Sequence, residues 1–213
     1  MPVDTRQRLI EAAVCRFYRD GFRNVGLDQI LADVAISKTA FYKHFPSKED
    51  LMLAALESQN VWLQQTFRSM VLSRAGVAVA DQLRSLLDVV EMIIESDQFH
   101  GCIFVNVAME FPSPHDPAHR AAAENKAAIE QLVCDIARQG EVPDPQGLAR
   151  ELCMIFEGAY VTRQTTGNPQ TVGIARRLAE RVLAGYLPRS AFPPDRPPET
   201  VPIPSCSNDV ESA

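Results

Sequence analysis

The chain has 213 residues, of which 46% are hydrophobic and 23% charged, a composition typical of a globular protein with its own core. The N-terminus lacks the apolar run of a secretory signal, and no stretch reaches the roughly eighteen apolar residues of a membrane span, so we expect a cytoplasmic protein without a membrane partner. Five cysteines without metal-like spacing predict reduced thiols and argue against a disulfide framework and against zinc.

The net charge of −6 is unevenly distributed along the chain. Residues 1–48 contain eight lysines and arginines against five acidic residues, a local balance of +3, so the remainder carries −9. A basic segment joined to an acidic one is the pattern expected when one part of a protein faces phosphates and the rest does not.

Two helices are predicted at the N-terminal end. The first follows Asp4, a good N-cap, and is marked by apolar residues of helical period over 9–17. Gly21 suits the left-handed position that ends a helix, which places Phe22 to fold back onto it. A second, short helix is expected over 27–34, with its apolar residues inward.

The stretch 36–45 has the composition of a DNA-reading helix. Ser37 is an N-cap, and Phe41 and Phe45, four residues apart, mark an inward face. The outward face carries side chains that can reach a phosphate or a base edge: Lys38, Thr39, Tyr42, Lys43 and His44. A solvated helix face is the alternative. Two short helices packed on a longer first one form a helix-turn-helix, so we expect a DNA-binding domain over residues 1–50.

The rest of the chain is also predicted to be helical, which makes the fold all-α. Helices are expected at about 47–72, 79–95, 102–111, 117–139, 145–166 and 169–187. The last three each follow an Asp-Pro or Asn-Pro pair, an N-cap before a proline. Residues 51–187 are therefore expected to form a second helical domain, and the proline-rich residues 188–213 a disordered tail.

A mostly apolar ligand pocket is expected between the long helices of this second domain. The candidate lining residues are Trp62, Phe67, Phe104, Asn106, Met109, Glu110 and Tyr160. For each aromatic side chain, ordinary core packing is the alternative. Residues 102–111 are apolar nearly all round and predict a fully buried helix, within which Asn106 and Glu110 need either a ligand or an internal hydrogen bond.

Cys102 follows Gly101 at the start of a predicted helix, where the helix dipole favours a reactive thiolate, although a buried inert thiol is the commoner case. His115 and His119 lie four residues apart without further ligands, so no metal is predicted. The sequence shows no paired carboxylates, no nucleophile with a base and no Gly-rich phosphate loop, so neither an enzymatic activity nor a cofactor is expected.

Residues 5–56 closely resemble the DNA-binding domain of TetR-family transcriptional regulators. The matching positions are residues 8–13, Phe17, residues 20–22, Ile30, residues 37–38 and residues 41–51. Residues 101–106 look like a segment that several members carry in the ligand domain. The resemblance implies an all-helical homodimer of about nine helices per subunit, whose C-terminal body binds a small molecule and whose helices near 145–166 and 169–187 pair with those of the partner.

The resemblance also implies which residues contact DNA. Thr39 and Ala40, with Lys43, match base-reading positions, whereas the positions that usually hold phosphates correspond to Tyr42, His44 and Lys48, with Lys38 beside them. Two positions depart from the family pattern. Gly26 stands where Ser or Thr commonly caps the second helix, and Ala35 stands where Gly is common in the turn.

These features predict a ligand-responsive transcriptional regulator. The leading hypothesis is a repressor that binds a palindromic double-stranded DNA operator as a dimer and is released by a small apolar or amphipathic effector. The alternative is a redox or electrophile sensor that switches through Cys102.

Overall fold

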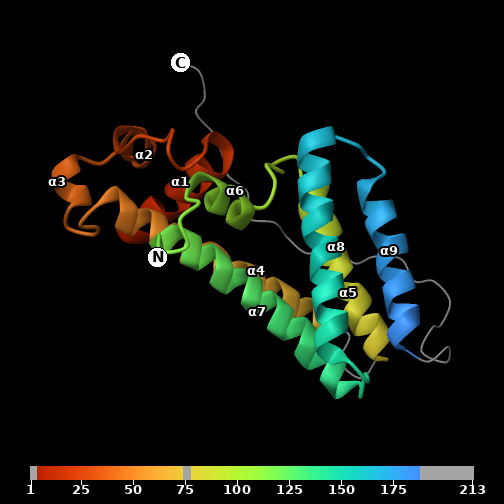
Figure 1. Cartoon of the computed structure of the whole chain (residues 1–213). Helices are drawn as coiled ribbons and strands as arrows, with labels where there is room; N and C mark the ends of the chain where they lie inside the picture. The colour runs from red at the N-terminus through yellow and green to blue at the C-terminus, as the bar shows by residue number, and fades with distance from the viewer. Residues whose placement is uncertain (1–3, 74–77, 188–213) are drawn as a thin grey trace. The chain divides into compact units, whose positions relative to one another are not determined.

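The computed structural model of the protein describes residues 4–73 and 78–187. Within these ranges the chain forms nine helices and no strand (Figure 1). They are α1 (Thr5–Asp20), α2 (Leu27–Val34), α3 (Lys38–Phe41), α4 (Lys48–Ser73), α5 (Val79–Ile94), α6 (Ile103–Glu110), α7 (Pro117–Gln139), α8 (Pro145–Thr166) and α9 (Thr171–Tyr186). The predicted all-α fold is confirmed, and the predicted tail at 188–213 lies outside the described residues.

The described residues fall into two compact units. The first contains residues 4–61 and 103–123, and the second contains residues 62–73, 78–102 and 124–187. α4 and α7 contribute to both units, whereas α6 groups with the N-terminal helices. The domain boundary after residue 50 stays a prediction.

A glycine with a positive φ ends α1 as expected, but its ψ of 154° lies outside the left-handed helical conformation that the sequence predicted. Gly21 adopts a positive φ of 87°, and the chain folds back so that the Phe22 ring stacks on Phe17 with centroids 5.1 Å apart. Phe22 is only 1% exposed, so the return of the chain adds a large side chain to the core of this unit. Asp4 precedes the helix as predicted, but its side chain forms no capping hydrogen bond.

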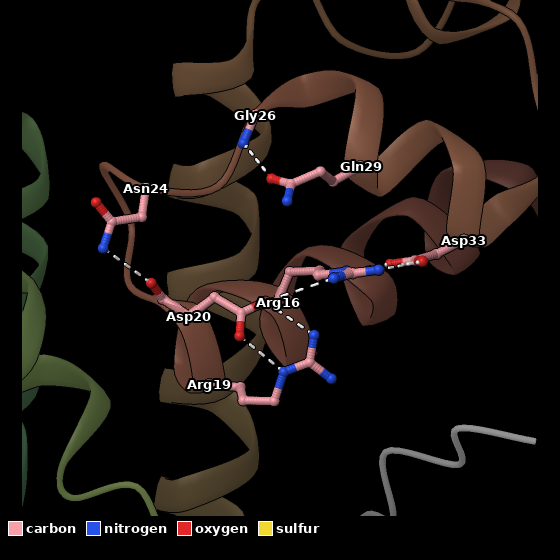
Figure 2. A network of polar contacts seen from close by, with 7 residues as sticks. All are labelled: Arg16, Arg19, Asp20, Asn24, Gly26, Gln29 and Asp33. Atoms are coloured by element: carbon pink, nitrogen blue, oxygen red, sulfur yellow. Dashed lines mark hydrogen bonds and ion pairs between the residues drawn. The ribbon is translucent and has the colours of Figure 1, made fainter. Parts of the chain in front are cut away.

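A network of ion pairs joins α1 to α2 (Figure 2). The Arg16 guanidinium donates to both carboxylate oxygens of Asp33, each at 2.6 Å, and Arg19 donates to Asp20 at 2.8 Å. The hydrogen bond from Arg19 is the main cause that lowers the pKa of the Asp20 carboxyl below its ordinary value. These side chains are about a third exposed, so their contribution to stability is modest and screened by salt.

The link between α2 and α3 holds a strained residue. Ala35 adopts the left-handed conformation, with φ 55° and ψ 48°, which costs an L-residue with a Cβ about 1 kcal/mol relative to glycine. We therefore expect Ala35→Gly to raise the free energy of unfolding by about 1 kcal/mol, measured by urea denaturation. The matched control is Ala32→Gly in the exposed interior of α2, expected to lower it by a similar amount. Destabilisation by both substitutions would contradict the strain at Ala35.

Two of the three predicted N-caps act before their helices, Asp116 before α7 and Asp144 before α8, whereas Asn168 does not cap α9, whose N-cap residue is Gln170. The backbone N–H of Ala118 donates to Asp116, that of Gly147 to Asp144 and that of Gln170 to Asn168, at 2.8–2.9 Å. α9 itself begins at Thr171, two residues after the expected start, because the chain first forms a turn at Asn168.

In the second unit α5, α8 and α9 pack against one another (Figure 1). Arg84 on α5 donates to both carboxylate oxygens of Glu180 on α9, at 2.7 and 2.9 Å. Arg176 on α9 donates in return to Asp88 of α5 at 2.8 Å and also to Glu91. These pairs fix which face of α9 meets α5 and leave its opposite face uncovered.

Candidate nucleic-acid interface

The segment predicted to read DNA has a buried face and a helix cap. The Ser37 hydroxyl accepts the backbone N–H of Ala40 at 3.2 Å, as expected for an N-cap. Phe41 and Phe45 are buried, with ring centroids 6.0 Å apart, which confirms the predicted inward face. Regular α-helix ends at Phe41, and helical turns continue to Phe45 through a hydrogen bond from the His44 N–H to the Phe41 carbonyl at 2.8 Å.

The opposite face of this segment presents the predicted contact residues to solvent. Thr39 and Lys43 are exposed, Ala40 and His44 are half-buried, and Tyr42 is 58% exposed. The Tyr42 ring meets Phe41 edge-on at 5.2 Å, so the core holds the ring while its hydroxyl stays outside. The assignment of individual residues to bases or phosphates stays a prediction.

Lys38 has a partner that the sequence did not indicate. Its ammonium lies 2.8 Å from a carboxylate oxygen of Asp28 on α2, and both side chains are largely exposed. The hydrogen bond to Asp28, followed by the attraction between the two charges, raises the pKa of the Lys38 ammonium. A phosphate at this position would have to compete with Asp28 for the same cation.

Lys48 also has an internal partner. Its ammonium donates to the carbonyl oxygen of Phe22 at 3.0 Å and lies 5.8 Å from the centre of the Phe17 ring. An ammonium has three donors, so one bond to a carbonyl leaves others for a phosphate. A further cation was missed from the sequence: the Arg6 guanidinium lies over the Phe45 ring at 5.0 Å, beside the DNA-reading segment.

The aromatic candidates for a ligand pocket in the second unit pack as core. Phe67 is 2% exposed and stacks on Phe156 at 6.5 Å, and Tyr160 stacks on Phe99 at 6.2 Å. Trp62 is half-buried. These contacts fit the core-packing alternative, and a role in a pocket stays a prediction.

The candidates on α6 have different environments. Phe104 is buried and Asn106 half-buried, but Met109 is 77% exposed, so the prediction of a fully buried helix is wrong for this position. The error arose because apolar residues all round a short helix do not show which face the rest of the chain covers. Glu110 has internal hydrogen bonds, the alternative that the sequence left open: its carboxylate accepts the backbone N–H groups of Phe22 and Arg23.

The cysteines differ in environment. Cys102, Cys134 and Cys153 carry free thiols. Cys102 is 9% exposed, and the Lys126 ammonium donates to its sulfur at 3.4 Å. Burial, with Glu130 and Glu157 nearby, raises the pKa of the Cys153 thiol to about 12.

No group of three or more side chains suited to a metal ion occurs within residues 4–73 and 78–187. His119, a residue of the predicted histidine pair, has its Nδ1 2.8 Å from the carbonyl oxygen of Phe111. None of the helices that the structure describes combines the length and the apolar character needed to cross a bilayer.

Two family models match most of the chain. Residues 9–55 match the model of bacterial regulatory proteins of the tetR family, and residues 79–179 match that of the tetracyclin repressor-like C-terminal domain. Both matched ranges agree with the order of the helices: the first covers the helix-turn-helix and the second runs from α5 into α9.

Similar proteins are regulators of transcription. HTH-type transcriptional regulator YjdC of Escherichia coli is 22% identical over 178 residues, which cover 84% of this chain and 93% of the relative. SrpR of Pseudomonas putida is 29% identical over 141 residues, 66% of this chain and 64% of the relative.

Solved structures of similar fold include SCO4454, a TetR-family transcriptional regulator from Streptomyces coelicolor. It superposes with a TM-score of 0.81 at 28% identity, covering 87% of this chain and 91% of that one. The reduced form of NemR from Escherichia coli has a TM-score of 0.73 at 21% identity, covering 84% and 97% of the two chains.

Proposed function

The chain belongs to the TetR family of transcriptional regulators and carries their DNA-binding helix-turn-helix, and from this premise we propose that it is a homodimeric repressor of a near-palindromic operator. A small apolar or amphipathic effector releases it from DNA. The DNA partner implies a cytoplasmic location. Each subunit of the dimer places its recognition segment, the residues around α3, in one of two successive major grooves of the operator.

The observation that carries the proposal is the two-faced segment around α3. Its inward face is anchored by Phe41 and Phe45, so the outward Thr39, Tyr42 and Lys43 are held in place by buried aromatic rings. Exposed hydroxyls and an exposed ammonium on a rigid helical turn are what phosphate and base contacts require.

The dimer is supported by an uncovered apolar face on α8 and α9. Four large apolar side chains on these helices are 39–75% exposed: Met154, Val161, Ile174 and Leu178. On the same sides of the two helices, a Cβ added at Gly158 or Gly185 would meet nothing within 4 Å. Two neighbouring helices with matching apolar stripes and glycines suit a four-helix contact with a second copy.

Release by an effector follows from a population shift. The dimer has one state whose recognition segments are spaced to fit the operator and another state whose spacing does not fit. An effector that binds the second state more tightly lowers the affinity for the operator, and the size of the decrease is set by the ratio of the effector's affinities for the two states. The aromatic residues of the second unit, Trp62, Phe67 and Tyr160, remain the candidates for its contacts.

The test is footprinting of the DNA beside the gene with the purified protein. Protection of a near-palindromic site is expected, and it should weaken steeply with salt because phosphate contacts release counterions. Tyr42→Ala, which removes an exposed ring, should abolish the protection. Absence of a protected site, or an unchanged footprint for Tyr42→Ala, would refute the proposal.

A second candidate function, a redox switch at Cys102, is favoured by one observation. The Lys126 ammonium donates to the Cys102 sulfur at 3.4 Å, and a cation beside the sulfur is a feature of cysteines that react with oxidants. The thiolate would attack hydrogen peroxide, forming an S–O bond while the O–O bond breaks and hydroxide leaves.

Peroxide treatment should then lower operator affinity about tenfold or more in the wild-type protein and leave Cys102→Ser unaffected. Cys153→Ser is the matched control: because the pKa of this thiol is about 12, it is protonated at neutral pH and its loss should change nothing. The redox role is excluded when Cys102→Ser keeps the full peroxide response.

A further inference from the structure

An ion pair lies beside the exposed face of the DNA-reading segment. The Lys38 ammonium lies 2.8 Å from one carboxylate oxygen of Asp28 and 3.1 Å from the other. Lys38 is the first residue of α3, and Asp28 lies in the first turn of α2, ten positions earlier in the sequence. The two helices of the helix-turn-helix are thus joined by side chains that remain 59% and 75% exposed.

The fold gains little from this pair. Water and salt screen an ion pair between largely exposed side chains, and holding both side chains in one geometry costs conformational entropy. The two helices have apolar anchors of their own, since Ile30, Leu31 and Phe41 are buried. We therefore expect the main effect of the pair on the charge that this surface presents to DNA.

The pair cancels a positive charge within the segment 37–48. Lys43 makes none of the described ion pairs or hydrogen bonds, and Lys48 donates to the carbonyl of Phe22, which carries no net charge. Lys38 differs from both because its partner carries a full negative charge. The helix dipole favours a carboxylate in the first turn of α2, so the charge of Asp28 is well placed where it is.

A phosphate that binds Lys38 must first separate this pair. A lysine that neutralises a phosphate releases counterions, and this gain underlies binding to DNA of any sequence. When Lys38 leaves Asp28, the carboxylate stays behind unpaired, close to the negative charges of the duplex. Both effects oppose a phosphate at this position, whatever the base sequence.

We propose that Asp28 is a specificity-determining residue that limits sequence-independent DNA binding by holding Lys38 in an ion pair, an inference that rests on the proposed function. On unrelated DNA the protein can shift along the duplex until a freed ammonium meets a phosphate. On the operator the base contacts fix the register, so a freed Lys38 gains at most as much there. Loss of the Asp28 charge therefore raises the affinity for unrelated DNA at least as much as the affinity for the operator.

The test is binding to a duplex of unrelated sequence, measured by fluorescence anisotropy over a range of salt concentrations. Asp28→Asn keeps the shape of the side chain and removes its charge, which frees Lys38. The affinity should rise about tenfold per dimer, and the slope of log K against log salt should steepen by about 1 per subunit. The affinity for the operator fragment identified by footprinting should rise by the same factor or less.

A double variant separates the ion pair from a phosphate contact. Asp28→Asn combined with Lys38→Met removes both charges, so its slope should match that of the wild type, in which the two charges cancel. Glu11→Gln is the matched control, because it removes the same charge from an exposed residue of α1 whose carboxylate accepts the neutral amide of Gln7 at 3.0 Å. Its slope should also match that of the wild type.

Three results would overturn the inference. The first is an unchanged slope in Asp28→Asn. The second is a double variant whose slope is lower than that of the wild type by about 1 per subunit, because Lys38 would then already contact a phosphate in the wild-type protein. The third is a higher ratio of operator affinity to unrelated affinity in Asp28→Asn. If the unrelated duplex responds as expected but no operator is protected, the proposed function fails and the role of the Asp28 pair stands.

Discussion

Replacement of Leu178 by glutamate is expected to raise the dissociation constant of the homodimer about a thousandfold or more, because each subunit would place an unpaired charge in the apolar contact. Leu178 is 42% exposed in the single chain and lies one turn from Ile174 on the uncovered face of α9. A two-fold contact uses the same patch on both subunits, so each dimer would bury two carboxylates. At about 2 kcal/mol each, the total of about 4 kcal/mol gives that factor.

The consequence for DNA binding should be equally large. A monomer contacts one half-site, so operator affinity should fall by several orders of magnitude while the helix-turn-helix stays folded. Sedimentation velocity at low micromolar protein and fluorescence anisotropy with labelled operator measure the two effects. Ala127→Glu, which adds the same charge at an exposed position on α7, is the matched control and should remain dimeric. A Leu178→Glu protein that sediments as a dimer would remove α9 from the interface.

The fold was largely predictable because its signals are local. The N-cap side chains of Ser37 and Asp144 accept hydrogen bonds from backbone N–H groups only three residues away. The return of the chain after α1 requires only a positive φ at Gly21. Even the strain at Ala35 follows from a departure visible in the sequence, an alanine where the turn favours glycine.

The environment of the candidate site was less predictable, because its contacts join residues distant in sequence. Two lysines predicted to bind phosphates already have partners within the protein: Lys38 pairs with Asp28, and Lys48 donates to the Phe22 carbonyl. These contacts leave each ammonium fewer donors for a phosphate, and no local sequence pattern reveals them. Glu110 shows the same limit: its polarity within an apolar helix announced a partner, but only the structure identifies the turn after α1.

The substitution Lys43→Ala is expected to make the free energy of operator binding less favourable by about 1–3 kcal/mol per half-site. It should also weaken the preference for one particular base at one base pair in each half-site. Lys43 is exposed, and unlike Lys38 and Lys48 it makes none of the described ion pairs or hydrogen bonds. Its ammonium therefore reaches a base edge without first breaking an internal contact. Anisotropy titrations against the operator and a set of single-base variants measure both effects.

Tyr42→Phe is the matched comparison, since it changes the neighbouring exposed residue by one oxygen and keeps the ring against Phe41. Loss of a hydroxyl that donates to a phosphate should weaken binding to every sequence equally, by about tenfold per half-site, and should leave the salt dependence unchanged because no charge is lost. The two variants thus separate specificity from positioning. If Lys43→Ala instead weakens all sequences alike and lowers the salt slope by about 1 per half-site, Lys43 contacts a phosphate, and base recognition must then come from Thr39 and Ala40.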